Sequence, residues 1–185
     1  MVKSIDTKLR TILDNVQLEY ILHRLAHQLI EVHGGFKDSI LLGVQPRGIT
    51  LCSIIHQLIE YKLKTKIYHG SIDISMHRDD IHLQGTNLSI GKTEIPISLD
   101  NKNIVLIDDV LYTGRTIRAA LDTLMDYGRP RDIELLVLID RRLHRHVPIQ
   151  AKYIGRAIDS IEEEKVKVIL EKDSKKNRVE ILTQE

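Results

Sequence analysis

Near its middle the chain reads Asn103-Ile-Val-Leu-Ile-Asp-Asp-Val-Leu-Tyr-Thr-Gly-Arg-Thr-Ile-Arg-Ala-Ala120. The run from Ile104 to Ile107 is continuously apolar, as expected of a strand that helices cover on both faces. Asp108 and Asp109 follow this run, at the carboxyl end of the strand, where open α/β sheets bind ligands. The segment therefore predicts a parallel strand that brings two carboxylates to a ligand site.

The turn after the acidic pair has the properties of a phosphate site. Thr113, Gly114, Arg115 and Thr116 offer backbone N–H groups, two hydroxyls and the positive end of a helix dipole. Gly114 lets the backbone approach an anion or take a positive φ. Because carboxylates repel phosphate, we interpret the acidic pair as a grip on two ribose hydroxyls and on water bound to magnesium. The alternative is a plain βα unit whose acidic pair caps the helix.

Composition is compatible with one globular domain over residues 1–185. The chain is 42% hydrophobic and 29% charged, with a formal net charge of +1. A nearly neutral chain creates no global field for nucleic acid, so an RNA site would have to be a local patch. Cys52 is the only cysteine and falls in a helical apolar pattern, which favours a core position. With no signal peptide or spanning segment recognised, we expect a cytoplasmic protein.

Helical and extended patterns alternate along the chain. This alternation predicts an α/β fold with a largely parallel sheet and helices on both faces. The neighbouring elements that we predict are a helix capped by Asp14 and ended by Gly34, a strand at 39–44, a helix from 48 to about 64, an extended segment at 66–76, a strand at 133–139 and a helix that Gly128 ends.

Two further segments interrupt this pattern. Gln45, Pro46, Arg47 and Gly48 form a glycine-flanked turn between a strand and a helix, which predicts a second anion site, although Arg47 alone would fit a surface role. Residues 77–100 form a long polar interruption that we interpret as a flexible hood over the active site. An ordinary hairpin or a disordered loop is the alternative. The base of this segment carries an unusual charge cluster, Arg78, Asp79 and Asp80.

The acidic pair and the Thr-Gly-x-Thr turn closely resemble the phosphoribosyl-diphosphate (PRPP) motif of type I phosphoribosyltransferases. Further motifs extend the resemblance over essentially the whole chain to the PyrR family, which pairs uracil phosphoribosyltransferase activity with RNA-dependent attenuation of pyrimidine genes. These motifs are Arg78-Asp79-Asp80, Asp108 to Thr116, Gly128-Arg129-Pro130, Asp140-Arg141 and Tyr153-Ile154-Gly155. The resemblance implies PRPP, uracil, UMP or UTP as ligands, Mg²⁺ as cofactor, and a homodimer or higher homo-oligomer.

The resemblance also implies roles for individual residues. Asp108, Asp109 and Arg47 would be catalytic, and the turn of residues 45–48 would hold pyrophosphate. Residues 112–116 would hold the 5′-phosphate, and Tyr112 stands where purine-salvage relatives commonly carry an aspartate, which favours a pyrimidine. Asp140 would bind magnesium or face the pyrophosphate. Tyr153 and Ile154 would bind the base, with a core aromatic as the alternative for Tyr153.

An RNA surface is the remaining expectation. Arg24 and His27 in the first helix and Arg145 in a later turn match basic or polar positions of the family's RNA surface. Val32 and Gln150 stand where better-known RNA-binding members tend to have arginines. Two alternatives stay open, a nucleotide-sensing RNA-binding regulator with little or no catalysis and a salvage enzyme that does not bind leader mRNA. His23 and His27 could also form a metal pair, but no third ligand is evident.

Overall fold

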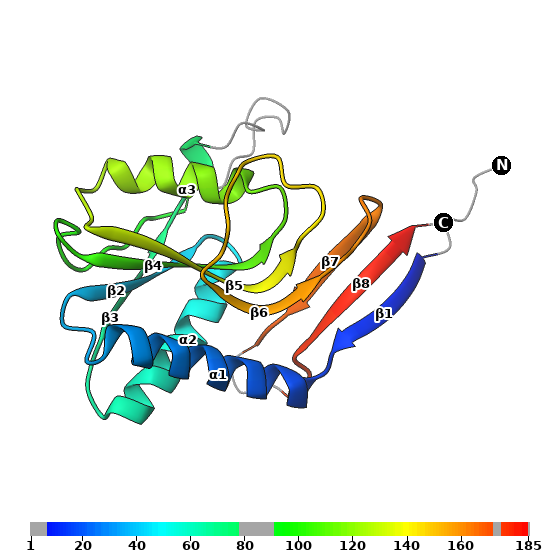
Figure 1. Ribbon diagram of the computed structural model, residues 1–185, viewed down its shortest axis with the longest axis horizontal. Helices are drawn as coiled ribbons and strands as arrows, with labels where there is room; N and C mark the ends of the chain where they lie inside the picture. The colour runs from blue at the N-terminus through cyan, green and yellow to red at the C-terminus, as the bar shows by residue number, and fades with distance from the viewer. Residues whose placement is uncertain (1–6, 78–90, 172–174, 185) are drawn as a thin grey trace.

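The computed structural model describes residues 7–77, 91–171 and 175–184, and these form two sheets (Figure 1). The larger sheet is parallel, with the strand order β3-β2-β4-β5-β6. The smaller sheet is antiparallel, with the order β1-β8-β7. The strands are β1 (Thr7–Leu13), β2 (Ser39–Val44), β3 (Tyr68–Ile72), β4 (Asn103–Leu111), β5 (Asp132–Arg141), β6 (Tyr153–Ile158), β7 (Glu164–Ile169) and β8 (Arg178–Gln184).

Helices cover both faces of the parallel sheet, as the sequence predicts. Helices α1 (Asn15–His33) and α2 (Gly48–Leu63) pack together on one face, and α3 (Arg115–Met125) lies on the other (Figure 1). The apolar side chains accordingly form two clusters, one on each side of the sheet. The central strands contribute to both clusters, which explains why their sequences are continuously apolar.

The ends of α1 follow from its sequence. The carboxylate of Asp14 accepts a hydrogen bond from the backbone N–H of Gln17 at 2.8 Å. The side-chain oxygen of Gln17 accepts one from the backbone N–H of Asp14 at 3.1 Å. This reciprocal pair satisfies two amides that the first helical turn leaves free. Gly34 ends the helix with a φ of +55° and donates to the Ile30 carbonyl. The predicted start and end of this helix are confirmed.

Strand β4 is longer than the apolar run predicted it to be. It continues to Leu111, so Asp108 and Asp109 lie within its last residues, and Asp108 is paired with Val137 of β5. Asp140 likewise lies inside β5, opposite Leu111. Strand pairing therefore fixes the backbone of all three acidic residues at the carboxyl ends of the parallel strands.

The antiparallel sheet was not predicted. Its strands pair the two ends of the chain, with Leu9 opposite Leu182 and Val166 opposite Ile181. Strand β7 alternates exposed lysines with valines that pack against the core cluster beneath α1 and α2. The valines anchor this sheet to the main body, and in Figure 1 it stands beside β6.

Only part of the predicted hood, residues 77–100, can be compared with the structure. Arg78, Asp79 and Asp80 lie outside the described residues. The segment that begins at Gly91 is fastened to its neighbours, because Glu94 forms a β-bridge with Ser71, the Lys92 carbonyl accepts a hydrogen bond from Gln45 at 2.7 Å and the Thr93 hydroxyl accepts one from the Asp73 amide. These contacts join the segment to β3, to the residue that follows β3, and, through Gln45, to the turn that follows β2.

Cys52 is a core residue, as predicted. It is 1% exposed, and burial raises the pKa of its thiol to about 12. A thiol that stays protonated at neutral pH is a poor nucleophile. No helix in the described ranges has the length and hydropathy needed to cross a bilayer.

Candidate functional site

A cleft of about 760 Å³ opens at the carboxyl edge of the parallel sheet. Its floor carries the acidic pair, and one wall comes from the antiparallel sheet. The cleft unites the ends of β2 and β4, the turn before α3, and strand β7. Its lining includes Gln45, Pro46, Arg47, Asp108, Asp109, Tyr112, Thr116, Arg141, Glu164, Lys165, Lys167 and Leu182.

The acidic pair is buried, and burial disfavours the ionised form of both carboxyl groups. Asp108 and Asp109 are each 6% exposed, and the Asp109 amide donates to the Asp108 carboxylate at 2.9 Å. Burial, followed by the neighbouring Asp109 charge, raises the pKa of Asp108 well above its usual range. Burial also raises the pKa of Asp109, although the Arg47 guanidinium opposes this effect. A cation in the cleft would relieve the cost of ionising both groups.

The turn after β2 brings Arg47 to the same cleft. Its Nη1 lies 4.0 Å from the Asp109 carboxylate, and the side chain is 67% exposed. Gly48 is required here, because a Cβ atom would lie 2.2 Å from the Ile107 carbonyl oxygen and 3.2 Å from the Asp108 Cα. This close approach is what sets the turn directly beside the acidic pair.

The predicted phosphate turn opens α3 at the same edge. Gly114 precedes the helix with a φ of +88°, a conformation that favours glycine. The Thr113 hydroxyl accepts a long hydrogen bond, 3.4 Å, from the Arg115 amide, and Thr116 lines the cleft. The first amides of a helix have no partner within the helix, so this end of α3 suits an anion.

Sequence reasoning missed Arg141. Its guanidinium carbon lies 3.8 Å above the centre of the Tyr112 ring, and its nitrogens donate to the Ser160 hydroxyl at 2.7 Å and to the Ile161 carbonyl at 2.8 Å. Arg141 thereby joins the floor of the cleft to the chain that leads into β7. Its position after Asp140 at a strand end was the available signal.

Arg145 is also part of this site. Its Nη2 lies 2.5 Å from the Asp140 carboxylate, and its Nη1 donates to the Tyr112 carbonyl. The side chain is only 19% exposed. The structure therefore places Arg145 inward, against the predicted phosphate turn, where it is unsuited to the outer RNA surface that we predicted for it.

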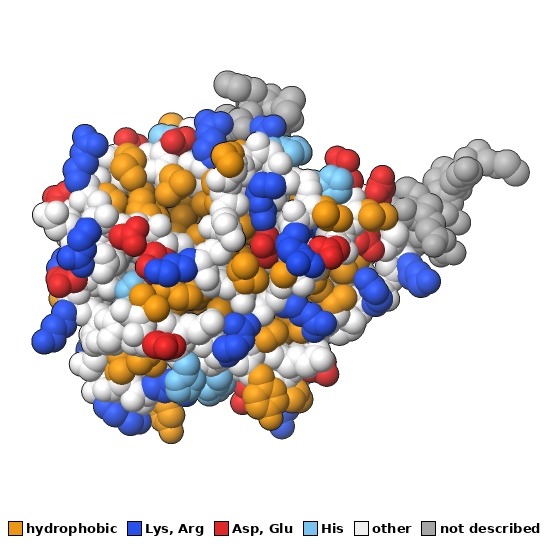
Figure 2. Space-filling model, in the orientation of Figure 1, with side chains coloured by type: hydrophobic (Ala, Val, Ile, Leu, Met, Phe, Trp, Pro, Cys, Tyr) orange, Lys and Arg blue, Asp and Glu red, His pale blue; other side chains and the backbone are white. Residues whose placement is uncertain are grey.

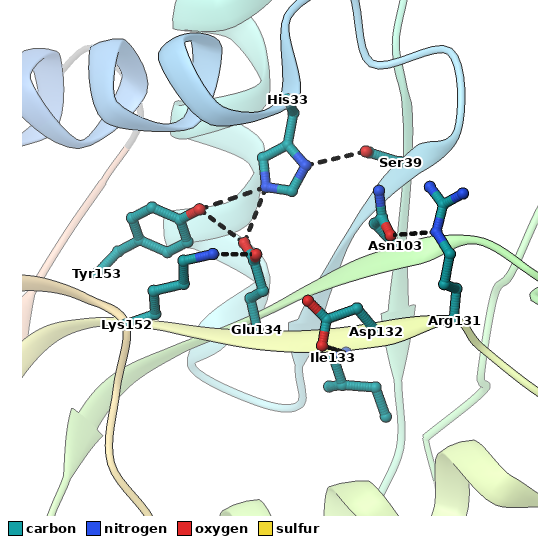
Figure 3. A network of polar contacts seen from close by, with 9 residues as sticks. All are labelled: His33, Ser39, Asn103, Arg131, Asp132, Ile133, Glu134, Lys152 and Tyr153. Carbon is teal, nitrogen blue, oxygen red and sulfur yellow. Dashed lines mark hydrogen bonds and ion pairs between the residues drawn. The ribbon is translucent and has the colours of Figure 1, made fainter.

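Tyr153 is a core residue, and its predicted role as a platform for the base is wrong. It is 4% exposed and begins β6, and its hydroxyl donates to the buried Glu134 at 2.6 Å (Figure 3). Glu134 also accepts from Lys152 and lies 2.9 Å from His33 Nε2. Burial acts to raise the pKa of Glu134, but the bonds from Lys152 and Tyr153 outweigh it and lower that pKa. The core alternative for Tyr153 is the correct one.

The backbone carbonyl of the neighbouring Ile154 is engaged by Arg24, and the role of Ile154 in binding the base stays a prediction. Its carbonyl accepts a hydrogen bond from Arg24 at 3.1 Å, and the next carbonyl, of Gly155, accepts one at 2.6 Å. Arg24 thus ties α1 to the edge strand β6, while its side chain remains exposed on the helix beside the exposed His27.

The acidic pair suits magnesium that arrives with a diphosphate. Within residues 7–77, 91–171 and 175–184, no group of three or more His, Cys, Asp or Glu side chains gathers as a metal cage. Mg²⁺ is usually held by one or two carboxylates together with phosphate oxygens and water. Asp108 and Asp109 would supply those carboxylates, whereas the carboxylate of Asp140 is engaged by Arg145.

This architecture defines a phosphoribosyltransferase of the type I fold. The chain matches the phosphoribosyl transferase domain family over residues 9–172. It superimposes on a hypoxanthine phosphoribosyltransferase of Staphylococcus aureus with a TM-score of 0.65 at 24% identity, covering 82% of this chain and 80% of that one.

Closer relatives place the chain in one branch of this class. It is 42% identical to the bifunctional protein PyrR of Geobacter sp. (strain M21), over 91% of this chain and 94% of the relative. It is 40% identical to the bifunctional protein PyrR of Caldicellulosiruptor saccharolyticus, over 93% and 94% of the two chains. The chain belongs to the PyrR family.

Proposed function

We propose that this protein transfers the 5-phosphoribosyl group of PRPP to uracil, giving UMP and pyrophosphate. The observation that carries the proposal is the buried acidic pair, which faces one cleft together with Arg47 and the start of α3. This is the arrangement that a substrate with a ribose between two phosphate groups requires. Membership of the PyrR family supports the choice of uracil.

The residues divide the substrate among them. The turn of Thr113 to Thr116 binds the 5′-phosphate, and the turn at Arg47 binds the pyrophosphate, whose charge bound magnesium would help to neutralise. Asp108 and Asp109 hold the ribose hydroxyls and stabilise positive charge on the sugar while its bond to pyrophosphate breaks and the bond to uracil N1 forms. The N1 proton passes to solvent or to a backbone group, because no general base is evident among the described residues that line the cleft.

Tyr112 favours a pyrimidine over a purine. It stands where purine-salvage relatives commonly carry an aspartate, and its ring is occupied by Arg141 on one face. A phenol beneath a guanidinium cannot replace a carboxylate as a proton partner for a purine nitrogen. The experiment is UMP formation from PRPP and uracil, with hypoxanthine as the competing base. Equal rates with both bases, or none with uracil, would contradict the proposal.

The protein also regulates pyrimidine genes through RNA binding that UMP strengthens. Identity of 40% or more to two bifunctional PyrR proteins supports this second activity. Arg24 and His27 remain as exposed candidates for the RNA surface on α1, where Val32 is 52% exposed. Binding of the protein's own leader mRNA, compared with a scrambled RNA with and without UMP, tests this activity. Sedimentation tests the homodimer on which the surface would lie.

A further inference from the structure

The segment from Arg145 to Val147 packs against the predicted phosphate turn and hydrogen-bonds to its backbone. The amides of His146 and Val147 both donate to the Thr113 carbonyl, at 2.9 and 3.0 Å. Arg145 donates to the carbonyl of the preceding residue, Tyr112. The two carbonyl groups that lead into Gly114 are therefore both engaged by this one segment.

These contacts matter because a carbonyl oxygen repels an anion. Bonds from the 145–147 segment fix both oxygens in place, so the turn can present its amides to a phosphate. Gly114 packs closely against the same segment, since a Cβ atom there would lie 3.3 Å from both the Cβ and the carbonyl oxygen of Val147. The turn and its support form one packed unit.

Arg145 adds a charge to this support. Its second contact neutralises Asp140, which is 6% exposed and lies opposite Leu111, the residue before Tyr112. Without Arg145, an uncompensated carboxylate would remain buried beside a site for phosphate. Removing one partner of a buried ion pair is costly for this reason.

We propose that Arg145 is a positioning residue for phosphoribosyl transfer, which holds the turn of Thr113 to Thr116 ready for the 5′-phosphate through Tyr112 and Asp140. This inference rests on the proposed function. It requires that Arg145 affect the affinity for the phosphoribosyl group more than the chemical step, because the guanidinium acts through the turn and does not touch the reacting atoms.

The test is Arg145→Gln, with Arg142→Gln as the matched control. Arg142 lies three residues before Arg145 in the chain, but its side chain is 59% exposed and pairs with Asp159 at the surface. Loss of bonds from a charged donor should raise the KM for PRPP and the Kd for UMP on the order of tenfold to a hundredfold. The expected change in kcat is much smaller, and the control should match the wild-type protein.

A second substitution separates positioning from general damage. Asp140→Asn removes the stranded charge, so the double variant Arg145→Gln with Asp140→Asn should recover part of the lost UMP affinity. If Arg145→Gln does not fold, Asp140→Asn alone decides the matter. This substitution weakens the hold on Arg145, so it should weaken UMP binding. The measurement is made without magnesium, so that a metal-binding role of Asp140 cannot produce the same result. Wild-type UMP affinity in Arg145→Gln, or in Asp140→Asn when only that variant folds, would overturn the inference. UMP calorimetry tests Arg145 even if the wild-type protein fails to form UMP, an outcome that would contradict only the proposed function.

Discussion

At the residue scale, the buried acidic pair lowers the stability of the unliganded protein at neutral pH. Burial raises the pKa of both carboxyls above their values in the unfolded chain. Folding therefore favours their protonated forms. Their contribution to stability is fully present below the unfolded pKa, about 3.9, and is lost as the pH rises through the raised folded values.

This sign predicts that Asp108→Asn stabilises the unliganded protein at pH 8. The amide removes the ionisation cost, and its oxygen can still accept the Asp109 N–H bond. Each kcal/mol gained would raise the melting temperature by about 2–4 °C for a chain of this size. Asp122→Asn, an exposed carboxylate on α3 that pairs with Arg118, is the control and should change little. A melting temperature at or below that of the wild-type protein would contradict the assignment.

Tyr153→Phe tests the corrected role of Tyr153. The substitution removes the hydroxyl that donates to buried Glu134, so it should cost about 1–3 kcal/mol in the free energy of unfolding. The KM for uracil should not change. Tyr127→Phe, at a site 47% exposed, controls for loss of a phenol. A raised uracil KM with unchanged stability would restore Tyr153 to the base site.

At the element scale, the phosphate turn depends on the backbone of Gly114. A side chain at a φ of +88° is strained, and it would also press on Val147. We expect Gly114→Val to lose both PRPP and UMP binding in calorimetry, and Gly114→Ala to lose part of it. Gly35→Ala is the control, because a Cβ there meets nothing within 4 Å. UMP affinity retained by a folded Gly114→Val protein would place the phosphate elsewhere.

The sequence predicted the central elements well and the antiparallel sheet not at all. Strands β2, β4 and β5 and the three α-helices carry long apolar patterns, caps and glycine stops that are readable locally. Strands β1 and β8 pair across nearly the whole chain, with Leu9 opposite Leu182, and no local signal names such a partner. For the same reason the sequence could not predict that the Arg145 side chain points inward. Its partners Asp140 and Tyr112 become neighbours only when β4 and β5 pair.

At the scale of the whole molecule, RNA binding has to come from a local surface. Positive and negative side chains alternate over the face shown in Figure 2, in keeping with a net charge of +1. We expect His27→Ala to weaken RNA binding and keep UMP formation. Unchanged RNA affinity would exclude His27 from the surface. Arg24→Ala is a poorer probe, because it also releases β6.

The central claim is that Asp108 and Asp109 stabilise the positively charged sugar during transfer. The most direct measurement is kcat/KM for UMP formation in Asp108→Asn, Asp109→Asn and the double variant, with melting temperatures to confirm folding. We predict a loss on the order of a hundredfold for each single substitution, as for one preorganised electrostatic group. UMP formation at the wild-type rate in a folded double variant would remove the acidic pair from the mechanism.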